Sequence, residues 1–107
     1  MSTFFVTKLG VARKVERSRI WLEGDRLKAA GFVVGSRFYV EREVGKHLRF
    51  VLGPAPTPSY RLRTVSGKGD KPIIDVTGYI VKSTFTGTHV SVQFDPGVIV
   101  VHQGAPQ

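Results

Sequence analysis

The chain has 107 residues, the size of a single compact domain, and its 41% apolar content can form a core, which argues against a disordered chain. It contains no cysteine, which excludes disulfide bonds and thiolate chemistry. Sixteen Lys and Arg residues against eight Asp and Glu residues give a net charge of +8, which favours a polyanionic partner, most often nucleic acid, although such a charge can also serve solubility alone.

The positive charge is concentrated in the first half of the chain. Residues 1–53 carry eleven basic and five acidic side chains, whereas residues 54–107 carry five and three. No apolar run approaches the roughly 18 residues of a membrane-spanning helix, and the first residues lack the pattern of a signal peptide. We therefore expect a cytoplasmic protein without a membrane partner, whose electrostatic footprint lies mainly on the first half.

Two strands are predicted near the start of the chain. Residues 4–9 are β-branched and aromatic, which is typical of a strand or an extended arm. A polar and basic segment over 13–19 leads into a second strand at 20–22. Trp21 lies in the middle of this strand, between two aliphatic residues, and we expect it in the core or at the rim of a barrel.

A short helix and a hairpin are predicted next. Asp25 is suited to cap a helix over 25–30, and Gly31 fits the left-handed position that ends helices. A strand with clean alternation then follows Gly35, with Phe38 and Val40 on one face and Arg37, Tyr39 and Glu41 on the other. A glycine-containing turn joins it to a returning strand over 48–52, which completes a hairpin with an apolar inner face.

The only clear linker separates two halves. Residues 53–59 hold three prolines, which keep the chain extended and deny it backbone donors. An alternating strand is predicted over 60–65, followed by a polar, glycine-rich loop over 66–72.

The second half repeats the order of the first. It begins with a strand over 73–76 and an irregular turn over 78–83 that Thr77 could cap. Two further strands follow, one ending at residue 92 and one beginning at residue 98, with a turn at residues 95–97 between them. A half of about 35 residues cannot bury a core alone, but two interlocked halves can.

The sequence therefore predicts one mostly β domain over residues 1–107. Its internal repeats are residues 19–52 and 72–101, joined by the linker 53–59. Each repeat is a β-α-β-β half, and the two halves would form a pseudo-two-fold barrel to which an N-terminal strand is added.

No catalytic or metal-binding pattern emerges. His47, His89 and His102 are scattered without metal-ligand spacing, and we interpret them as surface or strand histidines. Thr88 and Asp75 do not combine with a histidine in a way that marks a nucleophile and its base. We therefore expect a non-enzymatic protein with no catalytic residues, no metal and no cofactor.

The candidate site consists of cations that could follow a phosphate backbone. In an extended arm over 13–19, alternate residues face one side and could follow a phosphate backbone together. Arg61 and Arg63 share one face of their predicted strand, and Arg37 could face the same surface as these two arginines. Glycines beside the lysines of residues 66–71 would let backbone amides approach a phosphate, although the segment lacks the spacing of a nucleotide-binding loop. The predicted nucleic-acid-binding residues are Arg13, Lys14, Arg17, Arg19, Arg37, Arg61, Arg63, Lys68 and Lys71.

Other interpretations of these segments stay open. The basic arm can be a solvated charged segment, and residues 66–70 can be a plain turn. Tyr39, beside Arg37 on the polar face of its strand, could stack a single-stranded base.

The stretch from residue 19 to residue 40 carries Leu22-Glu23-Gly24, Leu27, Ala30-Gly31-Phe32 and Gly35. This stretch resembles the SymE-like family of AbrB-type swapped-hairpin proteins. Together with residues 65–75 it is also similar to small phage-encoded accessory segments associated with DNA cytosine methyltransferases. The resemblance implies DNA binding through arginines on the sheet and its flanking loops. AbrB-type domains usually dimerise by exchanging one hairpin per chain, whereas this chain holds both hairpins, so we expect a monomeric pseudo-dimer, with a homodimer as the alternative.

Three functions follow in order of preference. The first is phosphate-dominated binding of double-stranded DNA in a regulatory or phage-associated role. The second is a phage protein-interaction module, either an anti-defence inhibitor or an accessory factor of a host nucleoprotein complex. The third is a SymE-like RNA-acting toxin, for which the sequence offers no obvious general base.

Overall fold

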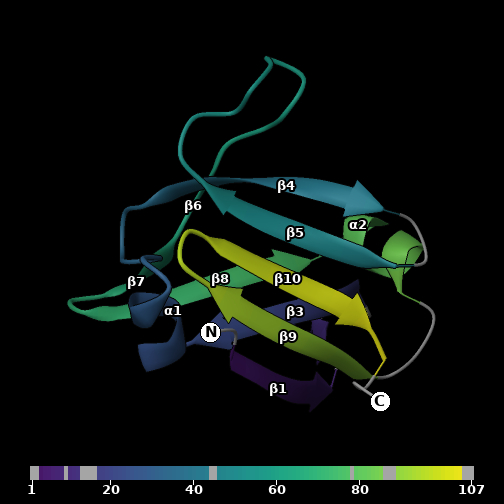
Figure 1. Cartoon of the computed structure of the whole chain (residues 1–107). Coiled ribbons are helices and arrows are strands. Elements are labelled where there is room, and N and C mark those ends of the chain that lie inside the picture. Colours follow the sequence, from purple (N-terminus) through teal and green to yellow (C-terminus); the bar gives the residue numbers. More distant parts are fainter. Residues whose placement is uncertain are drawn as a thin grey trace.

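The computed structural model describes residues 3–8, 10–12, 17–43, 46–77, 79–85 and 89–104. This part of the chain is mostly β, as predicted, and its strands form two open antiparallel sheets (Figure 1). The larger sheet has the order β1 (Thr3–Lys8), β9 (His89–Asp95), β10 (Val98–Gln103), β5 (His47–Leu52), β4 (Arg37–Glu43) and β6 (Arg63–Thr64). The smaller sheet has the order β2 (Gly10–Ala12), β3 (Arg17–Glu23), β8 (Lys71–Thr77) and β7 (Ser66–Lys68). Two short helices, α1 (Asp25–Ala29) and α2 (Tyr79–Thr84), follow β3 and β8.

Helix α1 is fixed mainly by its C-terminal end. Gly31 has a φ of 90°, and its N–H donates to Lys28 O at 2.9 Å, while the N–H of Phe32 donates to Leu27 O at 2.9 Å. These two backbone hydrogen bonds form a Schellman motif. The side chains of Leu27 and Phe32, the two residues joined by the second bond, are fully buried in the core. The expected cap by Asp25 is wrong, because Gly24 occupies the cap position with a φ of 91° and Asp25 is the first helical residue.

Helix α2 corrects the expectation of an irregular turn. Its residues include β-branched ones that are poor helix formers. Val81 and Thr84 are nevertheless fully buried, the helix packs against β3, and Thr84 Oγ1 donates to Ile80 O at 2.7 Å. Tertiary packing therefore outweighs propensity here. Thr77 ends β8, opposite Arg19, rather than capping the helix.

The connection between the halves also differs from the prediction. The strand expected over 60–65 is reduced to β6, which pairs with β4 only at Arg37 with Thr64 and at Phe38 with Arg63. The loop expected over 66–72 is a β-hairpin in which Lys68 lies directly opposite Lys71. Gly67, with a φ of 122°, lets the backbone of β7 pass close to that of β8.

Two strand pairings join segments that are distant in the sequence. β3 pairs antiparallel with β8, where Trp21 lies opposite Asp75, and β5 pairs antiparallel with β10, where Phe50 lies opposite Ile99. A single apolar cluster lies between the sheets, and the rings of Phe38 and Phe50 meet in it at a centroid distance of 5.6 Å. The core is therefore built from both halves of the chain.

None of the helices described here has the length and apolar character needed to cross a bilayer.

Candidate nucleic-acid interface

The basic arm predicted from the sequence is only partly visible. Arg13 and Lys14 lie outside the described residues, and so does the side chain of Arg17, whose backbone begins β3. Arg19 is described, and it does not extend freely into solvent. Its Nη2 donates to Asp75 Oδ2 at 3.2 Å, and its Nε lies 3.0 Å from Asp75 Oδ1 in ion-pair range, at an angle that does not make a hydrogen bond.

The same guanidinium covers a tryptophan. The Cζ atom of Arg19 lies 5.1 Å from the centre of the Trp21 ring, within the range of a cation–π contact. Trp21 is 43% exposed on the outer face of the smaller sheet, because Ile20 and Leu22 take the inward positions of β3. Of the two placements expected for Trp21, the core or the rim of a barrel, the core is therefore wrong.

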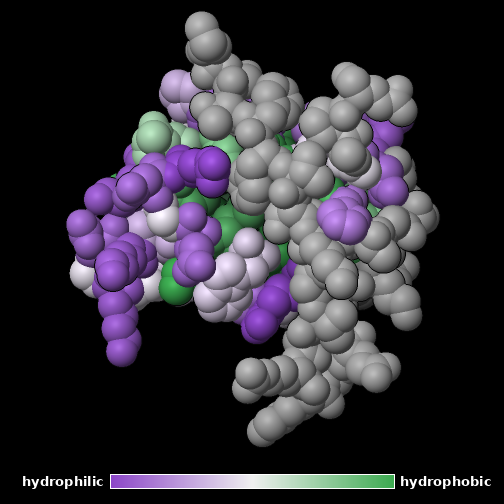
Figure 2. Space-filling model, turned by 90° about the horizontal axis from the view of Figure 1, so that it is seen from below, coloured by the Kyte–Doolittle hydropathy of each residue, from purple (hydrophilic) through white to green (hydrophobic). Residues whose placement is uncertain are grey.

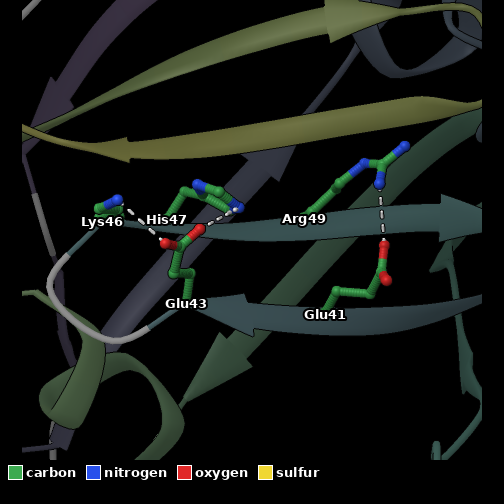
Figure 3. A network of polar contacts seen from close by, with 5 residues as sticks. All are labelled: Glu41, Glu43, Lys46, His47 and Arg49. Atoms are coloured by element: carbon green, nitrogen blue, oxygen red, sulfur yellow. Dashed lines mark hydrogen bonds and ion pairs between the residues drawn. The ribbon is translucent and has the colours of Figure 1, made fainter.

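Several other cations are neutralised by carboxylates. Lys46 Nζ lies 3.1 Å from Glu43 Oε1, and Arg49 Nη1 lies 3.1 Å from Glu41 Oε1; Figure 3 shows both ion pairs at the hairpin of β4 and β5. Lys28 Nζ lies 3.3 Å from Asp70 Oδ2. None of these ion-paired residues was among the predicted DNA contacts.

Five of the predicted contacts have no carboxylate within ion-pair distance among the described residues. Four of these side chains are exposed, and one is half-buried. The five, which we call the unpaired cations, are Arg37, Arg61, Arg63, Lys68 and Lys71. The pattern of ion pairs therefore leaves these five predicted residues without a carboxylate partner, whereas it pairs Arg19 with Asp75.

Arg61 and Arg63 lie close enough for the charge of one to influence the other. Burial lowers the pKa of the Arg63 guanidinium, and the like charge of Arg61 lowers that pKa further. An arginine remains protonated at neutral pH even so. Two like charges that influence each other without a carboxylate between them favour a bound anion, such as a phosphate.

Arg37 does not share the face of Arg63, which corrects the prediction of a common stripe. Arg63 lies directly opposite Phe38, which is buried, whereas Arg37 lies opposite Thr64. Residues that lie opposite each other leave the sheet on the same side, and neighbours along a strand leave it on opposite sides. Arg37 and Arg63 therefore lie at the same edge of the larger sheet but on its opposite faces.

Lys68 and Lys71 stand on the hairpin at the edge of the smaller sheet. They border a groove of about 600 Å³ whose lining also includes Glu23, Asp25 and Ile73. Figure 2 shows hydrophilic side chains gathered on the side of the molecule where β7 and α1 lie. Asp70, in the turn between the two lysines, forms its ion pair with Lys28.

One segment connects the two sheets and contains four of the five unpaired cations. It runs from Arg61, just before β6 at the edge of the larger sheet, through β7 at the edge of the smaller sheet, to Lys71 at the start of β8. Val65 fixes its middle, because Val65 is buried, its N–H donates to Ser36 O at 2.8 Å and its carbonyl accepts from Gly35 N at 2.9 Å. From Arg61 to Lys68 an extended chain covers about 23 Å, a length along which duplex DNA presents several phosphates.

Sequence reasoning missed three features of this surface, of which two are contacts. Asp75 removes the charge of Arg19, Trp21 is exposed, and Tyr60 packs on Tyr39 with ring centroids 5.3 Å apart. Only the position of Tyr60 directly after the proline-rich linker hinted at its role. Within the described chain, no group of three or more His, Asp or Glu side chains is arranged to hold a metal ion.

Comparison with models of protein families, with curated proteins and with solved structures finds no match for this chain.

Proposed function

We propose that the protein is a non-enzymatic DNA-binding protein that holds double-stranded DNA mainly through its phosphates. The observation that carries this proposal is the set of unpaired cations, which lie on the segment from Arg61 to Lys71 and at the start of β4. Lys28, Lys46 and Arg49 are held by carboxylates, whereas these five have no carboxylate within ion-pair distance among the described residues. A regulatory or phage-associated role is the context that the family resemblance suggests.

The proposal includes a physical expectation for salt. Each phosphate contact releases condensed counterions, so five contacts would give a slope of log K against log salt of roughly −4 to −5. Such a slope distinguishes phosphate binding from binding that depends on apolar contacts.

We also propose that the two sheets are a pseudo-two-fold, swapped-hairpin arrangement of the AbrB type within one chain. The antiparallel pairings of β3 with β8 and of β5 with β10 support this arrangement, since each places equivalent strands of the two halves side by side. On this basis the protein acts as a monomer.

Titration of a fluorescent duplex of about 20 base pairs across salt concentrations tests the function. We expect the doubly substituted variants Lys68→Gln with Lys71→Gln, and Arg37→Gln with Arg61→Gln, to weaken binding and to reduce the magnitude of the slope by up to about two. The matched control is Lys46→Gln with Arg49→Gln, which removes the same charge from ion-paired residues (Figure 3). Absence of binding at low salt, even to long duplexes, or equal losses in the control, would refute the proposal.

The exposed Trp21 favours one second function, a protein-interaction module. Trp and Arg dominate binding energy in protein interfaces, and Trp21 and Arg19 stand together on the outer face of the smaller sheet. A stoichiometric partner retained after nuclease treatment, and lost on Trp21→Ser, would support this function.

A further inference from the structure

An aromatic pair lies on the outer face of the larger sheet. Tyr39 belongs to β4, and Tyr60 ends the proline-rich loop that stands beyond β4 and β6 (Figure 1). Their ring centroids are 5.3 Å apart with an angle of 54° between the planes, and both side chains are half-buried. The loop therefore folds back far enough to complete a two-ring surface.

Two of the unpaired cations are close in the chain to the members of this pair. Arg37 lies two residues before Tyr39 on the same face of β4, a separation of about 7 Å along the strand. Arg61 follows Tyr60 directly in the chain, and both arginines are exposed. The next carboxylate along this face, Glu41, is already bound by Arg49, so it does not offset their charge (Figure 3).

The aromatic pair continues into an apolar stripe. Val51 lies directly opposite Tyr39, and Val98 lies directly opposite Val51. Both valines are half-buried on this face. Aromatic rings beside arginines that lack carboxylate partners are the combination that binds single strands, because every base has a π-face and every nucleotide has a phosphate.

We propose that the Tyr39–Tyr60 pair binds an unpaired nucleobase of a single-stranded nucleic acid, while Arg37 and Arg61 hold the adjacent phosphates. This inference rests on the proposed function, because attraction of phosphates brings the strand to the surface, and it adds a class of substrate. In a duplex both faces of a base are covered by stacking, so only an unpaired base can reach the tyrosines.

The direct test compares three ligands of equal phosphate number at the same salt concentration. They are a twelve-nucleotide oligothymidine, the corresponding abasic strand, and a blunt duplex with the same total number of phosphates; oligouridine distinguishes RNA from DNA. We expect the thymidine strand to bind on the order of 5- to 150-fold more tightly than the abasic strand, the range that stacking of one base gives. Equal affinity for the two strands would overturn the inference and leave salt-dependent duplex binding, and with it the proposed function, intact. No salt-dependent binding to any ligand would instead refute the proposed function.

Variants assign the effect to the tyrosines. Tyr39→Ala and Tyr60→Ala should each lower affinity for oligothymidine at least about fivefold and change affinity for the abasic strand less than about twofold. Tyr39→Phe keeps the ring and should restore binding, which separates stacking from any loss of folding in Tyr39→Ala. Trp21→Ala, which removes an exposed aromatic from the other sheet, should leave binding unchanged. Loss of the base-dependent increment in Trp21→Ala alone would overturn the assignment.

Discussion

Arg19 and Asp75 form an ion pair across the two central strands of the smaller sheet, with 3.0 Å between Arg19 Nε and Asp75 Oδ1. The two side chains are 32% and 31% exposed. The pair links β3 to β8 and removes from the basic surface one of the arginines that the sequence assigns to DNA. The charge that a chain contains and the charge that it can offer to a partner are therefore different quantities.

Replacing Asp75 should release the charge of Arg19. We expect Asp75→Asn to bind duplex DNA more tightly and to increase the magnitude of the salt slope by up to about one. The free energy of unfolding should fall by no more than about 1 kcal/mol, because partly exposed ion pairs contribute little. Anisotropy titrations and urea denaturation measure the two effects. In an Arg19→Gln background the same replacement of Asp75 should give a smaller gain, and an equal gain there would contradict the role of Arg19.

Gly67 should be required for the lysine hairpin. An alanine Cβ at this position would overlap the carbonyl oxygen of Lys71, and the φ of 122° is unfavourable for any L-residue. We expect Gly67→Ala to lower the free energy of unfolding by about 3 kcal/mol or more. It should also weaken DNA binding, since it displaces Lys68 and Lys71.

Gly69→Ala is the matched control, because Gly69 has a φ of 60° and open space around its Cβ position. It should cost only about 1 kcal/mol. Denaturant midpoints that are similar for the two variants would show that the hairpin does not pack as described.

His102 should make stability depend on pH. Burial lowers the pKa of His102 below its ordinary value of 6.5, and the neighbouring His47 lowers that pKa further. The unfolded chain therefore binds more protons than the folded chain, so the contribution of this group is complete above pH 6.5 and declines as the pH falls below it. Denaturation midpoints measured between pH 5 and pH 8 should rise with pH, and His102→Gln should flatten this rise.

The groups around His102 define the control. Its Nε2 lies 3.0 Å from Gln93 Oε1, its ring centroid is 6.2 Å from that of His47, and His47 Nε2 lies 3.8 Å from Glu43 Oε2. Lys46 shares Glu43 with His47, and Asp95 accepts from Gln93 at 2.7 Å. His47→Gln should raise the pKa of His102 measured by NMR, because it removes the like charge. A pKa of His102 at or above 6.5 in the native protein would contradict the prediction.

Neither half of the chain should fold alone. Without the second half, β5 loses β10 and the core loses Ile99 and Val101, both fully buried. We expect fragments cut in the proline-rich loop, 1–56 and 57–107, to lack a cooperative unfolding transition separately and to regain β structure when they are mixed. Circular dichroism with thermal denaturation measures this. A cooperative transition in one isolated fragment would show that the halves do not depend on each other.

Much of the local structure could be predicted from the sequence. Alternation marked the hairpin that follows Gly35, and Gly31 marked the end of the first helix, because period and glycine conformation are local properties of the chain. The predictions failed where packing outweighed local preference, as in helix α2, and where an alternating segment does not pair with the neighbouring strand, as in residues 60–62.

Part of the candidate site could also be predicted. Five of the nine predicted contacts are cations that lack carboxylate partners among the described residues. The sequence did not indicate that Arg19 is neutralised by Asp75, 56 positions away. It also did not indicate that Arg37 and Arg63 leave the sheet on opposite faces. Both depend on the register between strands.

The sequence by itself determined the mostly β character of this protein, the order of its elements and its excess of positive charge, because these follow from residue types and from spacing over a few positions. The tertiary structure alone decided which cations remain unpaired, that Trp21 is exposed, and that Tyr60 meets Tyr39. The reason is physical: ion pairs and ring contacts join residues that are distant in the chain, and a shift of one residue in strand register would move every side chain of that strand to the opposite face.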